Sequence, residues 1–367
     1  MATEKTMSTL TDKDLLNIPS GKAYDEIKNN IFSQNAELKI DFCGIKTIFP
    51  VFKKMDWLQC LNLSLNDVVL MDETSVNMLP PNLTELDMRC NEIKNQCIIN
   101  NLPLLKKLNL RSNGEMTYLK IIGSPDLVDL DISHSNISHI PELTNSIKYL
   151  YCHSIRSLES FPSLLQFNNL IKIDFDNCDI KIIDLYLPSS LQIINCISNT
   201  IDTLHIPKGS SVKELTMSHC NMKHIKGEFP RTLENIDFMR NMLDTIPSLA
   251  NCVCLKHIDL SDNLLVILPE LSFVSLTMLD ISNNNFTKDY FPLTDIQITN
   301  LARYSGPGEK NKLSYDSDSD DDVYSSYITI QNLNKQRRHT VNHFDIMMQN
   351  DYKNPNFIIF DGEETSC

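Results

Sequence analysis

Apolar residues recur between residues 35 and 286 with one spacing, and this spacing predicts a series of short strands. The spacing is L-x-x-L-x-L-x-x-[N/C]-x-L, and twelve consecutive segments follow it, ten of them plainly. Side chains two residues apart in an extended segment point to the same face. The fourth and sixth positions of each segment therefore face one interior. The segments begin at Asn35, Leu58, Leu83, Leu105, Leu127, Ile147, Leu170, Leu191, Val212, Leu233, Leu255 and Leu276.

The segments follow one another at a nearly constant interval, which predicts a stack of repeated turns. Successive starts are 21 or 22 residues apart from Leu170 onward and 20 to 25 apart before it. No single turn can bury its own apolar side, so neighbouring turns must stack and stabilise one another. We therefore expect a solenoid of about 12 repeats in which each apolar row lies on the next.

The ninth position of most segments is Asn or Cys, and we expect it to turn the chain away from the strand. Buried polar groups need hydrogen-bond partners, so these asparagines should bond backbone groups of adjacent turns. A cysteine in the same place packs well and is a weak donor. The asparagines are Asn66, Asn91, Asn113, Asn199, Asn241, Asn263 and Asn284, and the cysteines are Cys43, Cys178 and Cys220.

The rest of each repeat is about 10 residues long and is often marked by proline, as at Pro141, Pro247 and Pro269. Proline removes a donor and favours an extended predecessor, so we expect extended or 3₁₀ segments there and no ring of α-helices. This pattern resembles the leucine-rich-repeat family, and the P-x-x-L entry into several strands resembles its bacterial-effector subtype. The resemblance covers residues 35 to about 290. It implies an α/β-type solenoid with a curved parallel sheet on its concave face.

Outside the solenoid, which we place at residues 35–300, the composition changes. Residues 1–34 contain a helical pattern over Ala23–Gln34, with Ile27, Ile31 and Phe32 apolar, and we expect an N-terminal helical cap. Residues 301–327 have the composition of an acidic low-complexity linker. Residues 328–367 are a C-terminal tail or a second cap. Short kinase-like contexts make Ser317, Ser319 and Thr340 phosphorylation candidates.

The net charge of −14 argues against nucleic acid and anionic membranes as partners, because both require basic surface. The first residues carry no apolar signal-peptide segment, and no stretch reaches membrane-spanning length. Most of the 11 cysteines lie within repeats, as expected for free thiols in a reducing compartment. We therefore expect an intracellular, monomeric protein, in the cytoplasm with the nucleus left open, and not a secreted one.

No motif for catalysis occurs, so we expect a non-enzymatic protein without cofactor. The chain has no P-loop, no G-x-S-x-G and no H-E-x-x-H. His134 and His153 lie in adjacent turns near carboxylates, which makes a zinc site conceivable. The two histidines occupy different positions in their repeats, and no second-shell pattern around them can be read from the sequence, so we predict no metal.

The remaining candidate for function is the concave face, where acidic residues recur between the two buried positions. Neighbouring strands lie about 4.8 Å apart, so these carboxylates form a row. Two interpretations stay open: the acids are simply common at this position of the repeat, or they form an acidic docking stripe. The residues are Asp87, Asp131, Asp174, Asp237, Asp259 and Asp280.

One turn departs from this sequence pattern, and it is our candidate binding site. Tyr149, Tyr151 and His153 share the concave face, and aromatic residues beside charges are typical anchors of protein interfaces. We expect Asp131, Asp174 and Asp176 to flank them and give orientation. Arg89 and Arg111 form a smaller basic patch toward the amino end.

These features predict a module that binds another protein or peptide along its concave face. The alternative is an adaptor or effector in a ubiquitin-ligase or phosphatase complex, which recruits the enzyme through its termini.

Overall fold

The computed structural model describes residue 15, residues 18–286 and residues 303–305, the last three as a strand without side-chain detail. The chain divides into two units, Met1–Lys310 and Asn311–Cys367, and every described residue lies in the first. The expected linker lies outside the described residues except for 303–305, and the C-terminal tail lies wholly outside them. Ser317, Ser319 and Thr340 therefore stay predictions.

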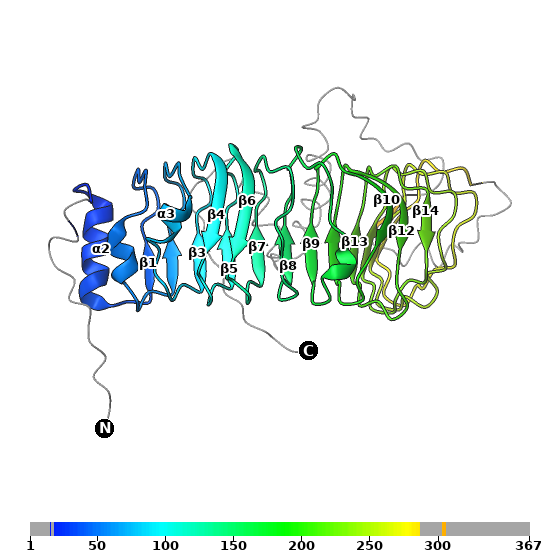
Figure 1. Cartoon of the computed structure of the whole chain (residues 1–367). Helices are drawn as coiled ribbons and strands as arrows, with labels where there is room; N and C mark the ends of the chain where they lie inside the picture. Colours follow the sequence, from blue (N-terminus) through cyan, green and yellow to red (C-terminus); the bar gives the residue numbers. More distant parts are fainter. Residues whose placement is uncertain (1–14, 16–17, 287–302, 306–367) are drawn as a thin grey trace. The chain divides into compact units, whose positions relative to one another are not determined.

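The main sheet has 13 strands, all parallel to their neighbours. Figure 1 shows its short strands side by side, one for each turn of the chain. The first twelve fall in the twelve predicted segments, which confirms the leucine-rich-repeat solenoid. In sheet order the thirteen strands are β1 (Glu37–Lys39), β2 (Cys60–Asn62), β3 (Glu85–Asp87), β5 (Lys107–Asn109), β7 (Asp129–Asp131), β8 (Tyr149–Tyr151), β9 (Lys172–Asp174), β11 (Ile193–Asn195), β13 (Glu214–Thr216), β15 (Asn235–Asp237), β16 (His257–Asp259), β17 (Met278–Asp280) and β18 (Arg303–Ser305).

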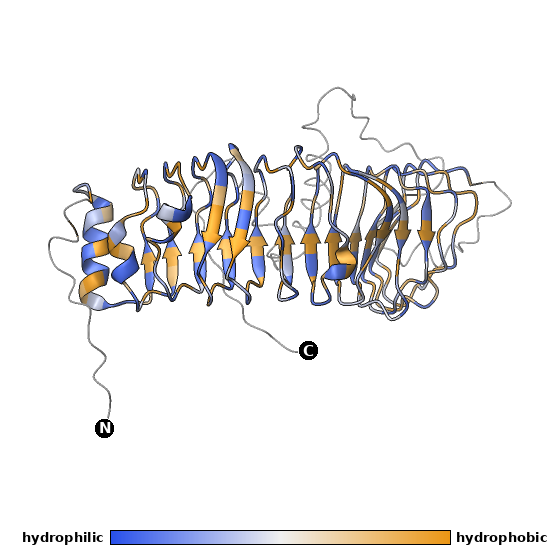
Figure 2. Ribbon diagram, in the orientation of Figure 1, coloured by the Kyte–Doolittle hydropathy of each residue, from blue (hydrophilic) through white to orange (hydrophobic). Residues whose placement is uncertain are grey.

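Equivalent positions pair across the sheet, so each apolar position forms a continuous row. Leu86 pairs with Leu108, Leu108 with Leu130, and Leu130 with Leu150. These side chains are buried, whereas the residues on either side of them in each strand are less so. Figure 2 shows apolar and polar residues alternating along successive turns. The row therefore points into the core and the flanking side chains point to the concave face.

The asparagines at the ninth position of successive repeats form a ladder, and we call this position the ladder position. As expected, their hydrogen bonds join each turn to the one before it. The Asn241 side chain accepts from the amides of Cys220 and Met222 at 3.1 and 2.9 Å. Its amide nitrogen donates to the Met217 carbonyl at 2.8 Å and the Phe238 carbonyl at 3.0 Å. The same pattern of one accepting oxygen and one donating nitrogen recurs at Asn66, Asn91, Asn113, Asn199, Asn263 and Asn284.

Other residues at the ladder position bond their neighbours less completely. Cys178 donates its thiol to the Cys152 carbonyl at 3.0 Å, and Cys220 donates to the Cys196 carbonyl at 3.0 Å. A thiol cannot replace the two-way bonding of an amide. In the turns of β7 and β8 the position is held by Ser135 and Ile155, of which Ser135 donates to the carbonyl of Ile132 within its own turn. The ladder is therefore weakest in these two turns.

The residue before each ladder position has a left-handed backbone, although none of the twelve is glycine. Their φ angles lie between 52° and 58°. A left-handed residue with a side chain is strained, but the repeat needs it to turn the chain out of the strand. The twelve are Phe42, Leu65, Cys90, Ser112, His134, Ser154, Asn177, Ser198, His219, Arg240, Asp262 and Asn283.

The convex side consists mainly of extended chain, as predicted, but part of it is organised as two small parallel sheets. One sheet pairs two strands and the other pairs three. Among the described residues, the helical segments on this side are one short α-helix and two 3₁₀ turns. The strands are β4 (Asn95–Asn100) and β6 (Met116–Ile122), then β10 (Lys181–Tyr186), β12 (Thr200–His205) and β14 (His224–Lys226). The helical segments are α3 (Glu73–Val76), η1 (Pro50–Lys54) and η2 (Leu164–Gln166).

Helix α2 (Lys22–Ser33) lies at the amino end of the solenoid, where a cap was expected (Figure 1). Ile27 is fully buried in the same core as the first repeats. Asn30 donates to the Glu37 carbonyl at 2.7 Å and accepts from the Trp57 indole at 3.0 Å. Phe32, which we placed on the packed face, is 78% exposed. Five helical residues after Ile27 correspond to about 140° of rotation away from it, so the expectation for Phe32 is wrong.

We expect replacement of Asn241 by Ala to destabilise the solenoid by about 3 kcal/mol, because several buried amides and carbonyls lose their partners at once. Urea unfolding followed by circular dichroism measures this loss. The matched control is Asn251→Ala, because Asn251 is exposed and no side-chain hydrogen bond of its amide group is found; its effect should stay within about 0.5 kcal/mol. Equal effects of the two substitutions would show that the ladder does not stabilise the fold.

Candidate protein-binding face

Strand β8 places Tyr149 and Tyr151 on the concave face, two residues apart and both half-buried. Tyr149 pairs with Asp129 on one side and with Lys172 on the other. Tyr151 likewise lies between strands β7 and β9. The Lys172 ammonium lies 5.2 Å from the centre of the Tyr151 ring, a cation–π contact. The predicted pair of aromatic residues among charged neighbours is therefore present on this face.

The carboxylates expected around the tyrosines are less open than the sequence pattern suggests. Asp131, Asp174 and Asp176 are only 9%, 8% and 7% exposed. Asp131 accepts from the Ser133 amide at 2.9 Å, and Asp176 accepts from the Ile197 amide at 2.6 Å. Their side chains are buried and bond the backbone of the turns. Their role in partner binding stays a prediction.

Burial also changes the charge of these acids. It raises the pKa of Asp174 to about 6, although the Asp176 amide and Lys172 oppose the shift. Burial, with the charge of Asp174, raises the pKa of Asp176 well above its usual value. The pKa of Asp129 rises to about 6, mainly through burial and then through repulsion from Asp131. These acids therefore protonate at a higher pH than an exposed Asp does, and the face around the tyrosines loses negative charge as the pH falls to about 6.

The acidic column has a structural cause that the sequence left open. Each acid accepts a hydrogen bond from the amide two residues further on, which closes the turn after its strand. The distance is 3.1 Å from Asp87 to the Arg89 amide, 3.1 Å from Asp237 to the Met239 amide and 2.9 Å from Asp259 to the Ser261 amide. Asn62 and Asn109 do the same in other turns. This bonding accounts for the column without a ligand.

Arg89 and Arg111 contact different side chains, and their role as a basic patch stays a prediction. The Arg89 Nε lies 3.4 Å from the Asp87 carboxylate of its own turn. Arg111 instead reaches across to two imidazoles: its guanidinium donates to Nε2 of His153 at 2.6 Å and to Nε2 of His134 at 3.2 Å. The two rings meet edge to face with their centres 4.6 Å apart. We call Arg111, His134 and His153 the arginine–histidine cluster.

The cluster keeps His153 neutral. Burial, the Arg111 charge and His134 together lower the pKa of His153 to about 2. Because both Nε2 atoms accept from Arg111, they do not point at a common metal position. Within the described residues, no group of three or more His, Cys, Asp or Glu side chains is arranged to hold a metal ion. The sequence could have indicated the contact, since Arg111 and His134 follow strands of adjacent turns, but we considered His134 only as a metal ligand.

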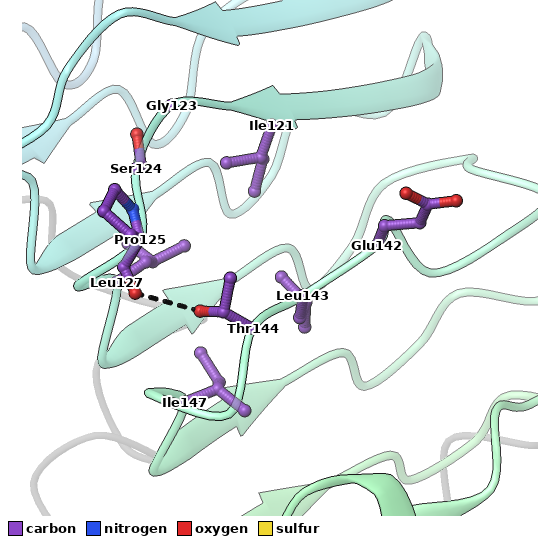
Figure 3. Close-up of a pocket in the computed structure, with 9 residues that line it drawn as sticks. All are labelled: Ile121, Gly123, Ser124, Pro125, Leu127, Glu142, Leu143, Thr144 and Ile147. Carbon is purple, nitrogen blue, oxygen red and sulfur yellow. Dashed lines mark hydrogen bonds between the residues drawn. The ribbon is translucent and has the colours of Figure 1, made fainter.

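A small cavity lies away from this face, between β6 and the following turn (Figure 3). Its volume is about 280 Å³, and most of its lining is apolar, from Ile121, Leu127, Leu143 and Ile147. Thr144 donates to the Pro125 carbonyl at 3.1 Å at its side. None of the predicted site residues lines it, so it supports none of the predicted chemistry. In addition, the described part of the chain contains no helix long and apolar enough to cross a membrane.

Comparison with known proteins supports the same fold. No family model matches the chain. It is 24% identical over 280 residues to an adenylate cyclase of Schizosaccharomyces pombe, across 59% of this chain and 16% of that protein. It is 27% identical over 175 residues to the human oligodendrocyte-myelin glycoprotein, across 47% of this chain and 36% of that protein. The chain thus spans about a third or less of the length of these curated relatives.

Among solved structures, the functional domain of InlJ from Listeria monocytogenes has a TM-score of 0.50 at 16% identity, covering 72% of this chain and 56% of that one. The leucine-rich effector YopM from Yersinia pestis has a TM-score of 0.43 at 19% identity, covering 80% of this chain and 96% of that one. At 16% identity the likeness to InlJ concerns the fold alone, and the YopM match carries no further conclusion. With the repeat, the parallel sheet and the asparagine ladder, the chain is a leucine-rich-repeat protein.

The row Asp237–Asp259–Asp280 predicts a dependence of stability on pH. Burial, then the charges of Asp237 and Asp280, raise the pKa of Asp259 to about 8. An unfolded Asp titrates near 3.9, so its contribution to stability is present below about pH 4 and is lost as the pH rises to about 8. Asp259→Asn keeps the acceptor oxygen but never ionises.

We therefore expect Asp259→Asn to stabilise the protein by on the order of 1 kcal/mol at pH 8.5, with a smaller gain at pH 5. Urea midpoints at the two pH values measure the difference. Asp126→Asn, at an exposed position, is the control and should show no such trend. A gain that does not grow with pH would contradict the raised pKa of Asp259.

Proposed function

We propose that the chain binds a protein or peptide on its concave face, centred on Tyr149 and Tyr151. Leucine-rich-repeat solenoids are typically interaction scaffolds, and their curvature creates extended binding surfaces. The observation that carries the proposal is the register of β8, which sets both rings on the open side between β7 and β9. Aromatic side chains that are partly exposed on a surface are frequent anchors of interfaces.

The rigidity of the solenoid supports this proposal. The face is built from short strands whose ends are fixed by backbone and side-chain hydrogen bonds, such as those that Asp131 accepts and Asn113 donates. Binding to a preformed surface loses little conformational entropy on the side of this chain. Lys172 lies over the Tyr151 ring and Asp129 lies beside Tyr149, so polar groups flank the aromatic pair. This combination suits a partner that buries an apolar side chain against the rings and pairs charges around it.

We expect Tyr149→Ala combined with Tyr151→Ala to weaken partner binding by about 2 kcal/mol or more, which is roughly thirtyfold. The measurement is affinity capture from the native cell, comparing by mass spectrometry the proteins held by each variant, followed by titration of the main one. Tyr118→Ala, an exposed tyrosine on the convex strand β6, is the matched control. Retention of the same proteins by the double variant would exclude this face.

We also infer that the protein works inside the cell. In the described part of the chain, ten cysteines are free, and Cys97, Cys152 and Cys196 among them are fully buried. Unpaired cysteines in this number are usual in a reducing compartment. The asparagine in each N-x-[ST] sequence, such as Asn136, then carries no glycan.

Alkylation of the unfolded protein, purified from its native cell without reductant, tests this inference. We expect mass spectrometry to find all 11 cysteines of the chain alkylated. Prior reduction should add no further alkylated site, which serves as the control. A site that becomes alkylated only after reduction would reveal a disulfide and contradict the inferred compartment.

A further inference from the structure

One row of residues crosses five neighbouring strands of the concave face and passes through Tyr149. The strand register places Tyr149 of β8 between Asp129 of β7 and Lys172 of β9. It continues with Ile193 of β11 beside Lys172, and with Glu214 of β13 beside Ile193. Each of these residues begins its strand and is partly exposed, whereas the residue after it is buried. We call the five residues the concave row.

The concave row contains two apolar groups, Tyr149 and Ile193, with Lys172 between them. The Lys172 ammonium lies 5.2 Å from the centre of the Tyr151 ring, and Tyr151 is two residues beyond Tyr149 along β8. The charged end of Lys172 is therefore directed away from the concave row. Its hydrocarbon stem lies between Tyr149 and Ile193, and such stems act as apolar surface. An apolar path thus extends across three strands, from β8 to β11.

The length of this path selects the conformation of a bound segment. Tyr149 and Ile193 are two strand spacings apart, which is about 9.6 Å when neighbouring strands lie about 4.8 Å apart. A polyproline II helix has three residues per turn and rises about 3.1 Å per residue, so side chains three residues apart share one face at about 9.3 Å. Side chains on one face of a β-strand are about 6.8 Å apart, which matches neither one nor two strand spacings.

An α-helix fits this path less well than a polyproline II helix. Residues seven apart in an α-helix are separated by about 10.5 Å along its axis, but the residues three and four positions after the first lie on the same stripe. These residues would meet the centre of the path, where Lys172 lies. The two residues between the apolar positions of a polyproline II helix instead point away from the path.

The chemistry around the path supports the same kind of segment. Grooves that bind polyproline II segments are lined by aromatic side chains, and the preformed helix loses little entropy on binding. Tyr149 supplies an aromatic ring at one end of the path. At the other end Glu214 lies directly beside Ile193, so its carboxylate favours a basic residue of the segment at that place.

We propose that the concave row binds a polyproline II segment of the partner, with two apolar residues three positions apart and a basic residue next to one of them. This inference rests on the proposed function and adds the conformation and sequence pattern of the partner to it. One apolar side chain packs against Tyr149 and the other against Ile193, and the basic side chain lies beside Glu214.

The test measures the binding of synthetic peptides to the full chain by isothermal titration calorimetry. One peptide carries two leucines three residues apart among prolines, with a lysine at its end, and a control peptide of the same composition carries the leucines two residues apart. We expect saturable binding of the first peptide, at least about tenfold tighter than that of the control. Ile193→Ala should weaken this binding about tenfold, because apolar contact area is lost. Ile183→Ala, at an exposed isoleucine on the convex strand β10, should leave it unchanged.

A reversal of charge tests the contact with Glu214 while every apolar side chain of the concave row is kept. Glu214→Lys should weaken binding of the lysine peptide and strengthen binding of a peptide with glutamate in the place of lysine. Glu228→Lys, at an exposed position after the convex strand β14, should do neither. This variant also tests the proposal if Ile193→Ala does not fold.

Equal affinity for the two leucine spacings, or no saturable binding of either peptide, would overturn the proposal. Tighter binding of an alanine-based helical peptide with leucines seven residues apart would also overturn it. The capture experiment with the Tyr149 and Tyr151 variants does not use these peptides. A partner that is captured through the tyrosines, together with equal affinity for the two spacings, would retain the proposed function and reject only the polyproline II segment.

Discussion

Each turn of this solenoid carries buried amide and carbonyl groups at the point where the chain leaves the main sheet, and the structure depends on satisfying them between neighbouring turns. Water cannot reach these groups, so the side chain at the ladder position must supply both a donor and an acceptor. Asparagine does this where it bonds the turn before and its own turn, as Asn241 does. The left-handed residue before it, such as Arg240, sets the direction of the chain. Apolar rows then stack in register because the turns are held at a constant offset.

The same constraint determines which side chains remain for recognition. Acids at the centre of the concave face are largely committed to the turn amides, as at Asp259 and Asp131. The side chains that do not bond turn amides are those that depart from the consensus of the repeat, and Tyr149 and Tyr151 are the clearest of them. Both lie in the turn of β8, where Ile155 replaces the ladder amide, next to the turn of β7, where Ser135 does. Arg111, His134 and His153 follow β5, β7 and β8, so aromatic and cationic groups meet in one region of the sheet.

The fold was largely predictable from sequence, because a strict apolar spacing and an in-phase asparagine leave few alternatives for a repeated turn. Even the convex side followed from proline and from the length of the repeat, although the pairing of β10 with β12 did not. For the candidate site, the sequence predicted only which residues of neighbouring strands lie side by side. The sequence indicated that Asp174 and Asp176 would flank the tyrosines, but not that they would be buried. The contact of Arg111 with His153 depends on a long side chain that crosses the turn of β7, and no spacing rule describes such a reach.

We propose that a preformed concave face, and not the convex strands, receives the partner. Hydrogen–deuterium exchange of the full chain, alone and saturated with its captured partner, distinguishes the two faces. We expect slower exchange on binding in peptides that cover residues 107–113, 129–134 and 149–154, and unchanged exchange over β10 and β12. Slower exchange confined to the convex strands, with no change around Tyr149 and Tyr151, would contradict it.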